Sequence, residues 1–248
     1  TDMESRMYAK AFEIEEYLNS NPLKPYISCE YMHAMGNSLG GMEYYTRLED
    51  KYEKYQGGFI WDYIDQAICY TNNYGEKVLG YGGDFKDRFT DSNFCGNGIV
   101  FANRDVSPKA QEVKYLYQDI IIEPNDDGAM ITNKMMFSST SKYKFVYSLK
   151  QGKTILQKGT FIADVKPGES KQIYFSWLIP SDGEFIKTVS AQLVEDKLWA
   201  SKGFEVAFGQ DVVGKYSSTK TTNKPLKIVE GVGNLGIKYD NFEALFAI

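Results

Sequence analysis

Tyr26-Ile27-Ser28-Cys29-Glu30 is a short apolar run that ends in a carboxylate, and it follows a helix predicted over residues 8–19. Such a run is typical of a buried strand in a parallel sheet. Residues 39–55 repeat apolar and tyrosine side chains every three or four positions, which predicts an amphipathic helix. Residues 59–64 form a second apolar run after two glycines. Strand, helix and strand in this order predict a parallel sheet covered by a helix.

Polar residues stand at the carboxyl ends of both predicted strands, Glu30 on the first and Asp62 on the second. In a (β/α)8 barrel these strand ends form the rim that carries the active site. Residues 66–105 are rich in Gly, Asn and Asp but also contain aromatic residues. A loop of this length is usually functional or disordered, and its aromatic residues indicate that it packs. A closing helix is expected over residues 108–118.

From about residue 119 the pattern changes to short alternating runs separated by turn residues. Six or seven such strands predict an immunoglobulin-like β-sandwich over residues 119–200. Residues 201–248 continue with strand patterns on both sides of a Ser/Thr/Lys-rich stretch at 215–224. About fifty residues are too few for a second complete sandwich, so we expect a linker and the start of a further β-domain.

The composition narrows the class of protein. Of 248 residues, 43% are hydrophobic and 15% aromatic, which indicates a globular chain. The net charge of -5 argues against nucleic acid as the main partner, and no apolar run is long enough to cross a membrane. The three cysteines are odd in number and lack CxxC spacing, so we expect reduced thiols in a cytoplasmic protein.

The chemistry of Glu30 is ambiguous from the residues alone. A glutamate held at the tip of a barrel strand suits glycoside hydrolysis, which uses two carboxyl groups across the scissile bond. A single glutamate after an apolar strand is nevertheless more often structural than catalytic. Glu30 is therefore only a candidate at this point.

The stretch from Cys29 to Gly41 resembles the nucleophile signature of the glycoside hydrolase family 2 β-galactosidases. Residues 26–118 resemble the family in the order and spacing of four further blocks: Gln56-Gly57-Gly58-Phe59-Ile60-Trp61-Asp62, Tyr81-Gly82-Gly83-Asp84-Phe85, Asn93-Phe94-Cys95 and Val100-Phe101-Ala102. The resemblance implies that residues 1–118 are the C-terminal part of a TIM barrel, with its last two strand–helix units. Residues 119–195 match the β-sandwich domain that follows the barrel in this family, in their position and in their pattern of short strands.

The resemblance also implies roles for individual residues. Glu30 corresponds to the nucleophile that forms a galactosyl-enzyme intermediate. His33 and Trp61 correspond to residues that contact galactose, through its hydroxyl groups and its apolar face. Phe94, through its backbone carbonyl, and Asn97, through its side-chain oxygen, correspond to ligands of a monovalent cation, usually Na+, and Asn97 also borders the substrate.

Each of these residues has a simpler interpretation. His33 could be a hydrogen-bonded loop residue, Trp61 a core residue, and Asn97 part of a turn with Gly98. Three aspartates near the strand ends and in the loop could be mistaken for the second carboxylate, but the resemblance gives them structural roles: Asp62, Asp65 and Asp84. The tyrosine-rich face of the 39–55 helix is expected in the core.

Half of the chemistry is expected outside this chain. In the family the acid/base glutamate and the main Mg2+ ligands lie upstream, so we expect the chain alone to be inactive. Its partners would be a galactoside substrate and either the missing N-terminal part of the enzyme or a complementing subunit. A barrel piece leaves open sheet edges, and the full-length form is expected to be a homo-oligomer.

Three interpretations therefore compete. The leading one is a piece of a retaining β-galactosidase that acts on terminal β-galactosides such as lactose. A related specificity, such as β-glucuronidase or β-mannosidase, is the first alternative. A non-catalytic carbohydrate-binding or scaffold protein built around the sandwich is the second.

Overall fold

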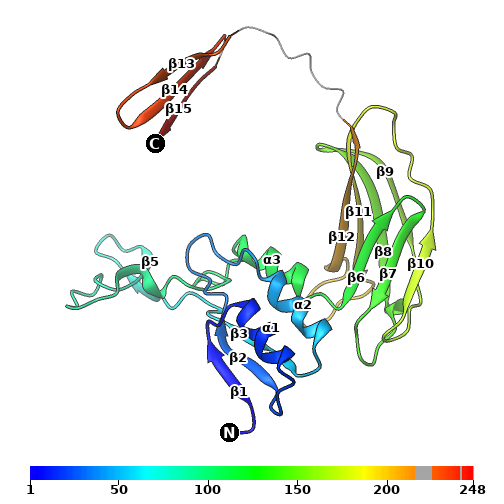
Figure 1. Cartoon of the computed structure of the whole chain (residues 1–248), viewed down its shortest axis with the longest axis horizontal. Coiled ribbons are helices and arrows are strands. Elements are labelled where there is room, and N and C mark those ends of the chain that lie inside the picture. The colour runs from blue at the N-terminus through cyan, green and yellow to red at the C-terminus, as the bar shows by residue number, and fades with distance from the viewer. Residues whose placement is uncertain (216–224, 241, 248) are drawn as a thin grey trace.

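The computed structural model describes residues 1–215, 225–240 and 242–247 (Figure 1). Most of the stretch predicted as a linker, residues 216–224, lies outside the described residues. An α/β portion at the N-terminus is followed by a β-sandwich and then by a small antiparallel sheet.

The α/β portion is built on a parallel sheet with the strand order β1-β2-β3. β1 spans Glu4–Met7, β2 spans Tyr26–Tyr31 and β3 spans Tyr55–Ile60. Helices α1 (Ala11–Asn19) and α2 (Glu43–Lys51) connect them. This confirms the predicted strand–helix–strand order, but the described sheet has three strands where the sequence predicts two.

β1 escaped prediction because its residues, Glu4-Ser5-Arg6-Met7, show no apolar run. It joins the sheet through backbone pairing with β2, from Glu4 opposite Tyr26 onward, and backbone pairing requires no apolar side chains. The helix predicted over 39–55 is also shorter than expected. Gly41 has a positive φ of +83° before the helix starts, and Tyr55 already belongs to β3.

The helices pack on one face of the sheet through a small apolar cluster. Its buried members include Ile14 and Leu18 of α1, Leu48 of α2, and Tyr26 of β2. Tyrosines of α2 and its C-terminal end pack against this cluster, as predicted: Tyr45 and Tyr52. This cluster sets the positions of β2 and β3 relative to both helices.

The long segment after β3 contains short elements only. Its elements are the antiparallel hairpin β4 (Ile68–Thr71) and β5 (Lys77–Gly80), and a 3-10 turn at Ser92–Cys95. The predicted closing helix is α3, Lys109–Leu116.

The sandwich consists of two antiparallel sheets. One has the order β10-β7-β6: Ser170–Tyr174, Gly128–Asn133 and Ile120–Asn125. The other has the order β12-β11-β8-β9: Glu205–Lys215, Gly183–Leu193, Tyr143–Gln151 and Thr154–Phe161, with a 3-10 turn at Thr140–Lys142 before β8. Buried residues of both sheets form its core, among them Ile122, Ile131, Phe145, Val189 and Ala207. The predicted sandwich class is confirmed.

β12 lies beyond the sandwich boundary that the sequence predicts at residue 200. It pairs with β11 along its length and also meets β6 of the opposite sheet. A Cβ on Gly209 would stand 1.7 Å from the carbonyl oxygen of Ile122 in β6. Only glycine permits this close approach, which joins the edges of the two sheets.

A further sheet follows the sandwich, with the antiparallel order β13-β14-β15: Lys227–Glu230, Asn234–Tyr239 and Phe242–Ala247. Apolar side chains on β13 and β15 are exposed, including Ile228 and Leu245. Among the described residues, no helix has the length and apolar character needed to cross a membrane.

The sandwich contains a fully buried lysine side chain. Lys187 on β11 is fully buried, and its Nζ donates to the carbonyl oxygen of Asn125 at 3.2 Å and to Oδ1 of Asp126 at 2.9 Å. Oδ2 of Asp211 lies 3.5 Å from the same Nζ. Asp126 is almost fully exposed, so water solvates it whether or not the lysine is present. The lysine bears most of the desolvation cost of this ion pair.

We expect Lys187→Met to keep or raise the free energy of unfolding, because it removes the buried charge but retains most of the side-chain volume. Lys187→Ala should lower it by about 2–4 kcal/mol, since it leaves a cavity. Urea unfolding of the 248-residue chain measures both. A loss in Lys187→Met as large as that in Lys187→Ala would show that the ion pair is the stabilising element.

Candidate active site

Glu30 lies next to the end of β1, as parallel pairing requires. Met7 is the partner of Glu30 in the β1–β2 ladder, and the backbone N–H of Tyr8 donates to the carbonyl oxygen of Glu30 at 2.8 Å. The carboxyl ends of neighbouring parallel strands meet at one edge, so side chains that follow β1 and β2 converge there.

Tyr8 is a site residue that the sequence analysis missed. Its hydroxyl lies near the Glu30 carboxylate: partial burial first, and then the interaction with this carboxylate, raise the pKa of Tyr8 to about 12. Tyr8 also adopts a positive φ of 54°, an uncommon backbone conformation that often accompanies functional sites. A tyrosine after an unrecognised polar strand carries no sequence signal of its own.

His33 brings three segments together. Its ring centroid lies 6.0 Å from that of Tyr8 and 5.4 Å from that of Phe94. The end of β1, the loop after β2 and the turn at 92–95 therefore meet around His33. These segments lie up to about ninety positions apart in the sequence, and in the structure His33 and Phe94 are neighbours.

Trp61 is held at the end of β3 by two backbone hydrogen bonds. Its N–H donates to the carbonyl oxygen of Tyr31 at 3.1 Å, and its own carbonyl oxygen accepts from Ala34 N–H at 2.7 Å. The peptide bond between Trp61 and Asp62 is cis. The Trp61 side chain is 37% exposed, so it is not a core residue within the described part of the chain.

Asn97 is buried but incompletely hydrogen-bonded. It is 2% exposed, and its Nδ2 donates to the carbonyl oxygen of Phe94 at 3.1 Å. Its Oδ1 has no hydrogen-bond partner among the described residues. A buried oxygen without a partner is costly, and it is the kind of atom that coordinates a hard cation.

The loop of Asn97 is fixed against the segment after β3. Asp62 N–H donates to the carbonyl oxygen of Asn97 at 2.7 Å, and Ile99 N–H donates to that of Asp62 at 3.0 Å. A Cβ on Gly98 would come within 2.2 Å of the backbone nitrogen of Asp65, so the two segments are in direct backbone contact.

The three aspartates that could be mistaken for a second catalytic carboxylate form local hydrogen bonds. Asp62 accepts from Gln66 Nε2 at 2.5 Å, and Asp65 accepts from Gly98 N–H at 2.7 Å. Asp84 accepts from Tyr81 N–H at 2.9 Å. These bonds agree with the structural roles expected for all three.

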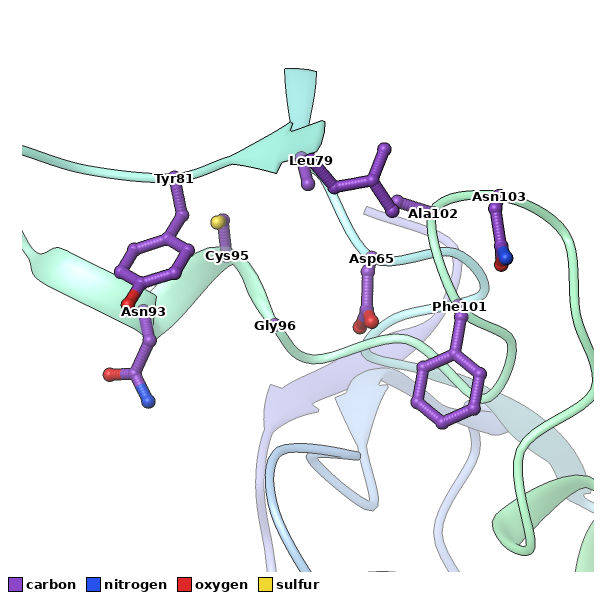
Figure 2. Close-up of a pocket in the computed structure, with 10 residues that line it drawn as sticks. Asp65, Leu79, Tyr81, Asn93, Cys95, Gly96, Phe101, Ala102 and Asn103 are labelled. Atoms are coloured by element: carbon purple, nitrogen blue, oxygen red, sulfur yellow. The ribbon is translucent and has the colours of Figure 1, made fainter. Parts of the chain in front are cut away.

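A pocket of about 310 Å3 is lined in part by the turn at Ser92–Cys95, which carries Phe94 (Figure 2). Figure 2 shows Tyr81, Asn93 and Cys95 grouped on the left, and Leu79, Asp65 and Phe101 towards the right. None of the predicted site residues Glu30, His33 or Trp61 lines this pocket. The candidate site is instead the open edge of the parallel sheet.

This edge carries one carboxylate next to a hydroxyl donor, an imidazole, an exposed indole and an unpartnered amide oxygen. The structure thus brings His33 together with Phe94 and with Tyr8, which neighbours Glu30, and backbone bonds attach Trp61 and Asn97 to the same edge. Among the described residues, no group of three or more His, Cys, Asp or Glu side chains is arranged to hold a metal ion.

Family models of known proteins match most of the chain. The family model "Glycosyl hydrolases family 2, TIM barrel domain" matches residues 1–122, and "Beta-galactosidase, domain 4" matches residues 129–214. A protein named "Beta-galactosidase" from Clostridium acetobutylicum is 51% identical over 249 residues, which covers 98% of this chain and 28% of that protein. A protein of the same name from Halalkalibacterium halodurans is 50% identical over 252 residues, which covers 100% of this chain and 25% of that protein.

A protein named "Beta-galactosidase large subunit" from Latilactobacillus sakei is 58% identical over 118 residues, which covers 47% of this chain and 19% of that protein. The chain spans about a quarter of the length of the longer relatives that it matches throughout.

A hydrogen bond between the Tyr8 hydroxyl and the Glu30 carboxylate can be tested by titration. In Glu30→Gln the pKa of Tyr8 should fall part of the way from about 12 to the ordinary value of roughly 10, because burial, the larger cause, remains while the adjacent negative charge is gone. Because the folded-state pKa is raised, the contribution of Tyr8 to stability is complete below pH of about 10 and is lost as the pH rises towards 12.

NMR of ring-labelled tyrosine, assigned with Tyr8→Phe, measures this pKa. Glu4→Gln removes a carboxylate elsewhere on β1 and serves as the control. An equal pKa in Glu30→Gln and in the unsubstituted chain would contradict the hydrogen bond.

Proposed function

The chain belongs to glycosyl hydrolase family 2, and from that membership we propose that it supplies the nucleophile half of a retaining β-galactosidase active site. The observation that carries the proposal is the position of Glu30, at the carboxyl end of β2 and opposite Met7 at the end of β1, with Tyr8 beside it. The named relatives and their identities over the whole chain support galactosidase over the β-glucuronidase and β-mannosidase alternatives.

The proposed reaction begins with attack of the Glu30 carboxylate on the anomeric carbon. The bond to the leaving oxygen breaks as a second carboxyl group protonates it, and a covalent galactosyl-enzyme forms. Water then releases galactose from Glu30, with that second group acting as base. The hydroxyl of Tyr8 orients the Glu30 carboxylate and stabilises its charge between turnovers.

We assign substrate contacts to the residues that surround Glu30. The His33 ring, held between Tyr8 and Phe94, would hydrogen-bond sugar hydroxyl groups. The exposed Trp61 ring would lie against the apolar face of a terminal β-galactoside such as lactose. Asn97 would border the same substrate through its loop.

We also propose a monovalent cation, Na+, at the carbonyl oxygen of Phe94 and Oδ1 of Asn97. The buried, unpartnered Oδ1 supports this proposal. The amide presently turns Nδ2 towards Phe94, and exchange of Nδ2 and Oδ1 by side-chain rotation would direct two oxygens at one ion. When bound, such an ion supplies positive charge that can attract a substrate hydroxyl oxygen. Mg2+ in the whole enzyme would take its main ligands from outside this chain.

The second carboxyl group is proposed to come from the rest of the enzyme, either a preceding segment or a complementing subunit. The three described strands leave sheet edges that a full barrel would pair. We therefore propose that the chain alone is inactive and that the complete form is a homo-oligomer. The cytoplasmic location stays a prediction.

A chimera tests the proposed function. The aligned segment of the Clostridium acetobutylicum relative is replaced by this chain, and a chromogenic β-galactoside is the substrate. We expect turnover by the chimera and a loss of at least about a thousandfold in Glu30→Gln, because the nucleophile is gone. The isolated chain should show no more turnover than its own Glu30→Gln variant.

Two outcomes would contradict the proposal. An inactive but folded chimera would favour the non-catalytic interpretation of the sandwich, and calorimetry with galactose would then test binding alone. Turnover by the isolated chain would show that the second carboxyl group lies within it.

The cation site is tested by the Na+ dependence of the chimera. Asn97→Ala should raise the Na+ concentration for half-maximal activity at least about tenfold, because one of the two proposed oxygen ligands is lost. Asn103→Ala, in the neighbouring pocket, is the matched control and should leave it unchanged. An unchanged Na+ dependence in Asn97→Ala would eliminate this amide as a ligand.

A further inference from the structure

A connection of side chains starts at the residue after Glu30. Tyr31 is 1% exposed, and its hydroxyl is hydrogen-bonded to that of Tyr117, which follows α3. Burial raises the pKa of both hydroxyl groups, so neither ionises near neutral pH. The Tyr31–Tyr117 pair therefore links the end of β2 to the end of α3 through uncharged groups.

Gln118 continues the connection into the sandwich. Its Nε2 donates to the carbonyl oxygen of Phe208 at 3.1 Å, and its Oε1 accepts from the N–H of Phe208 at 2.9 Å. The side-chain amide thus pairs with both backbone groups of one residue in β12, as a neighbouring strand would. Gln118 is 8% exposed, so water competes little for these bonds.

Helix α3 is attached to β12 by further contacts around this amide. The ring of Tyr115 lies 5.3 Å from that of Phe208. Lys114 forms an ion pair with Glu205 at 2.8 Å, and its ammonium lies 5.7 Å from the Phe208 ring. The end of α3 and the start of β12 are therefore joined by several independent interactions.

The ladder around Glu30 needs such an attachment, because backbone pairing is irregular there. The register between β1 and β2 shifts between Arg6 and Met7, next to the partner of Glu30. The register between β2 and β3 shifts between Ser28 and Tyr31. Met32, directly after the strand, has a positive φ of 51°.

Tyr31 also holds the backbone of Trp61 in place, because the carbonyl oxygen of Tyr31 accepts a hydrogen bond from the Trp61 N–H. Its ring packs edge-on against Tyr45 at 5.3 Å. A Cβ on Gly58 would approach the Tyr31 ring to 3.1 Å, so the absence of a side chain at that position makes room for the ring. The position of Tyr31 thus sets the backbone of both proposed site residues beside it.

We propose that the β-sandwich positions the nucleophile through the series Tyr31, Tyr117, Gln118 and Phe208. In this proposal Tyr31, Tyr117 and Gln118 are positioning residues, and none contacts the substrate. A nucleophile has to be held within about 0.5 Å of its productive place, which a strand end with irregular pairing does not ensure by itself. The proposal rests on the function proposed for Glu30.

The first experiment uses the active chimera with Tyr117→Phe, Tyr31→Phe and the double variant. Each single variant leaves one buried hydroxyl without a partner, so we expect a lower Tm and an about tenfold lower kcat, with KM changed less than about twofold. The double variant removes both hydroxyl groups and should recover Tm, while kcat stays low. Recovery of kcat together with Tm would show a purely structural role and overturn the proposal.

Asp50→Asn is the matched control. Asp50 on α2 forms an ion pair with Lys134 of the sandwich at 2.6 Å, outside the proposed series. We expect kcat and KM of this variant to stay at the level of the unsubstituted chimera. A loss of kcat equal to that in Tyr117→Phe would show that any contact with the sandwich matters, and would overturn the specific route.

A second experiment needs no activity, so it separates this proposal from the proposed function. Hydrogen exchange is followed in the 248-residue chain at the amides of Tyr8, Ala34 and Trp61, which are hydrogen-bonded around Glu30 and Tyr31. Gln118→Leu should accelerate exchange at these amides about tenfold, and Asp50→Asn should not. Unchanged exchange in Gln118→Leu would overturn the proposal even where the chimera is active.

Discussion

Parallel pairing of β2 with its two neighbours is the constraint on which the rest of this molecule depends. Because parallel strands end at the same edge of a sheet, residues that directly follow β1, β2 and β3 have to meet. Tyr8 and Trp61 directly follow β1 and β3, and Glu30 lies one residue before the end of β2. The proposed roles of Glu30 and Trp61 follow from this convergence, since no local motif could bring these side chains together.

The sheet does not hold this edge unaided. The apolar cluster formed by α1, α2 and the strands lies under the other end of β2, around Tyr26. Near Glu30 the ladder is irregular, and the contacts come from segments far along the chain: the 92–100 turn, the end of α3 and β12. The sandwich has its own core, and in our proposal the edge is supported against it.

Much of the fold could be predicted because it follows local patterns. The apolar run at 26–30, the helical spacing before Tyr52 and the alternation after residue 119 led to the correct classes of element and to the sandwich. The predicted extent of the parallel sheet and of the sandwich was wrong where contacts between residues distant in sequence decide that extent. β1 is polar and pairs only through its backbone, and β12 belongs to the sandwich because Gly209 lets it meet Ile122.

The sequence by itself determined which residue is the candidate nucleophile: a glutamate after a buried run, within a stretch that resembles a family 2 nucleophile signature. Covalent order sufficed there, because the signature is a continuous stretch of residues. Only the tertiary structure decided which groups surround that carboxylate. Tyr8, the His33–Phe94 contact and the Tyr31–Tyr117 pair join positions distant along the chain, and such contacts exist only once the sheet is formed and the sandwich is packed against it.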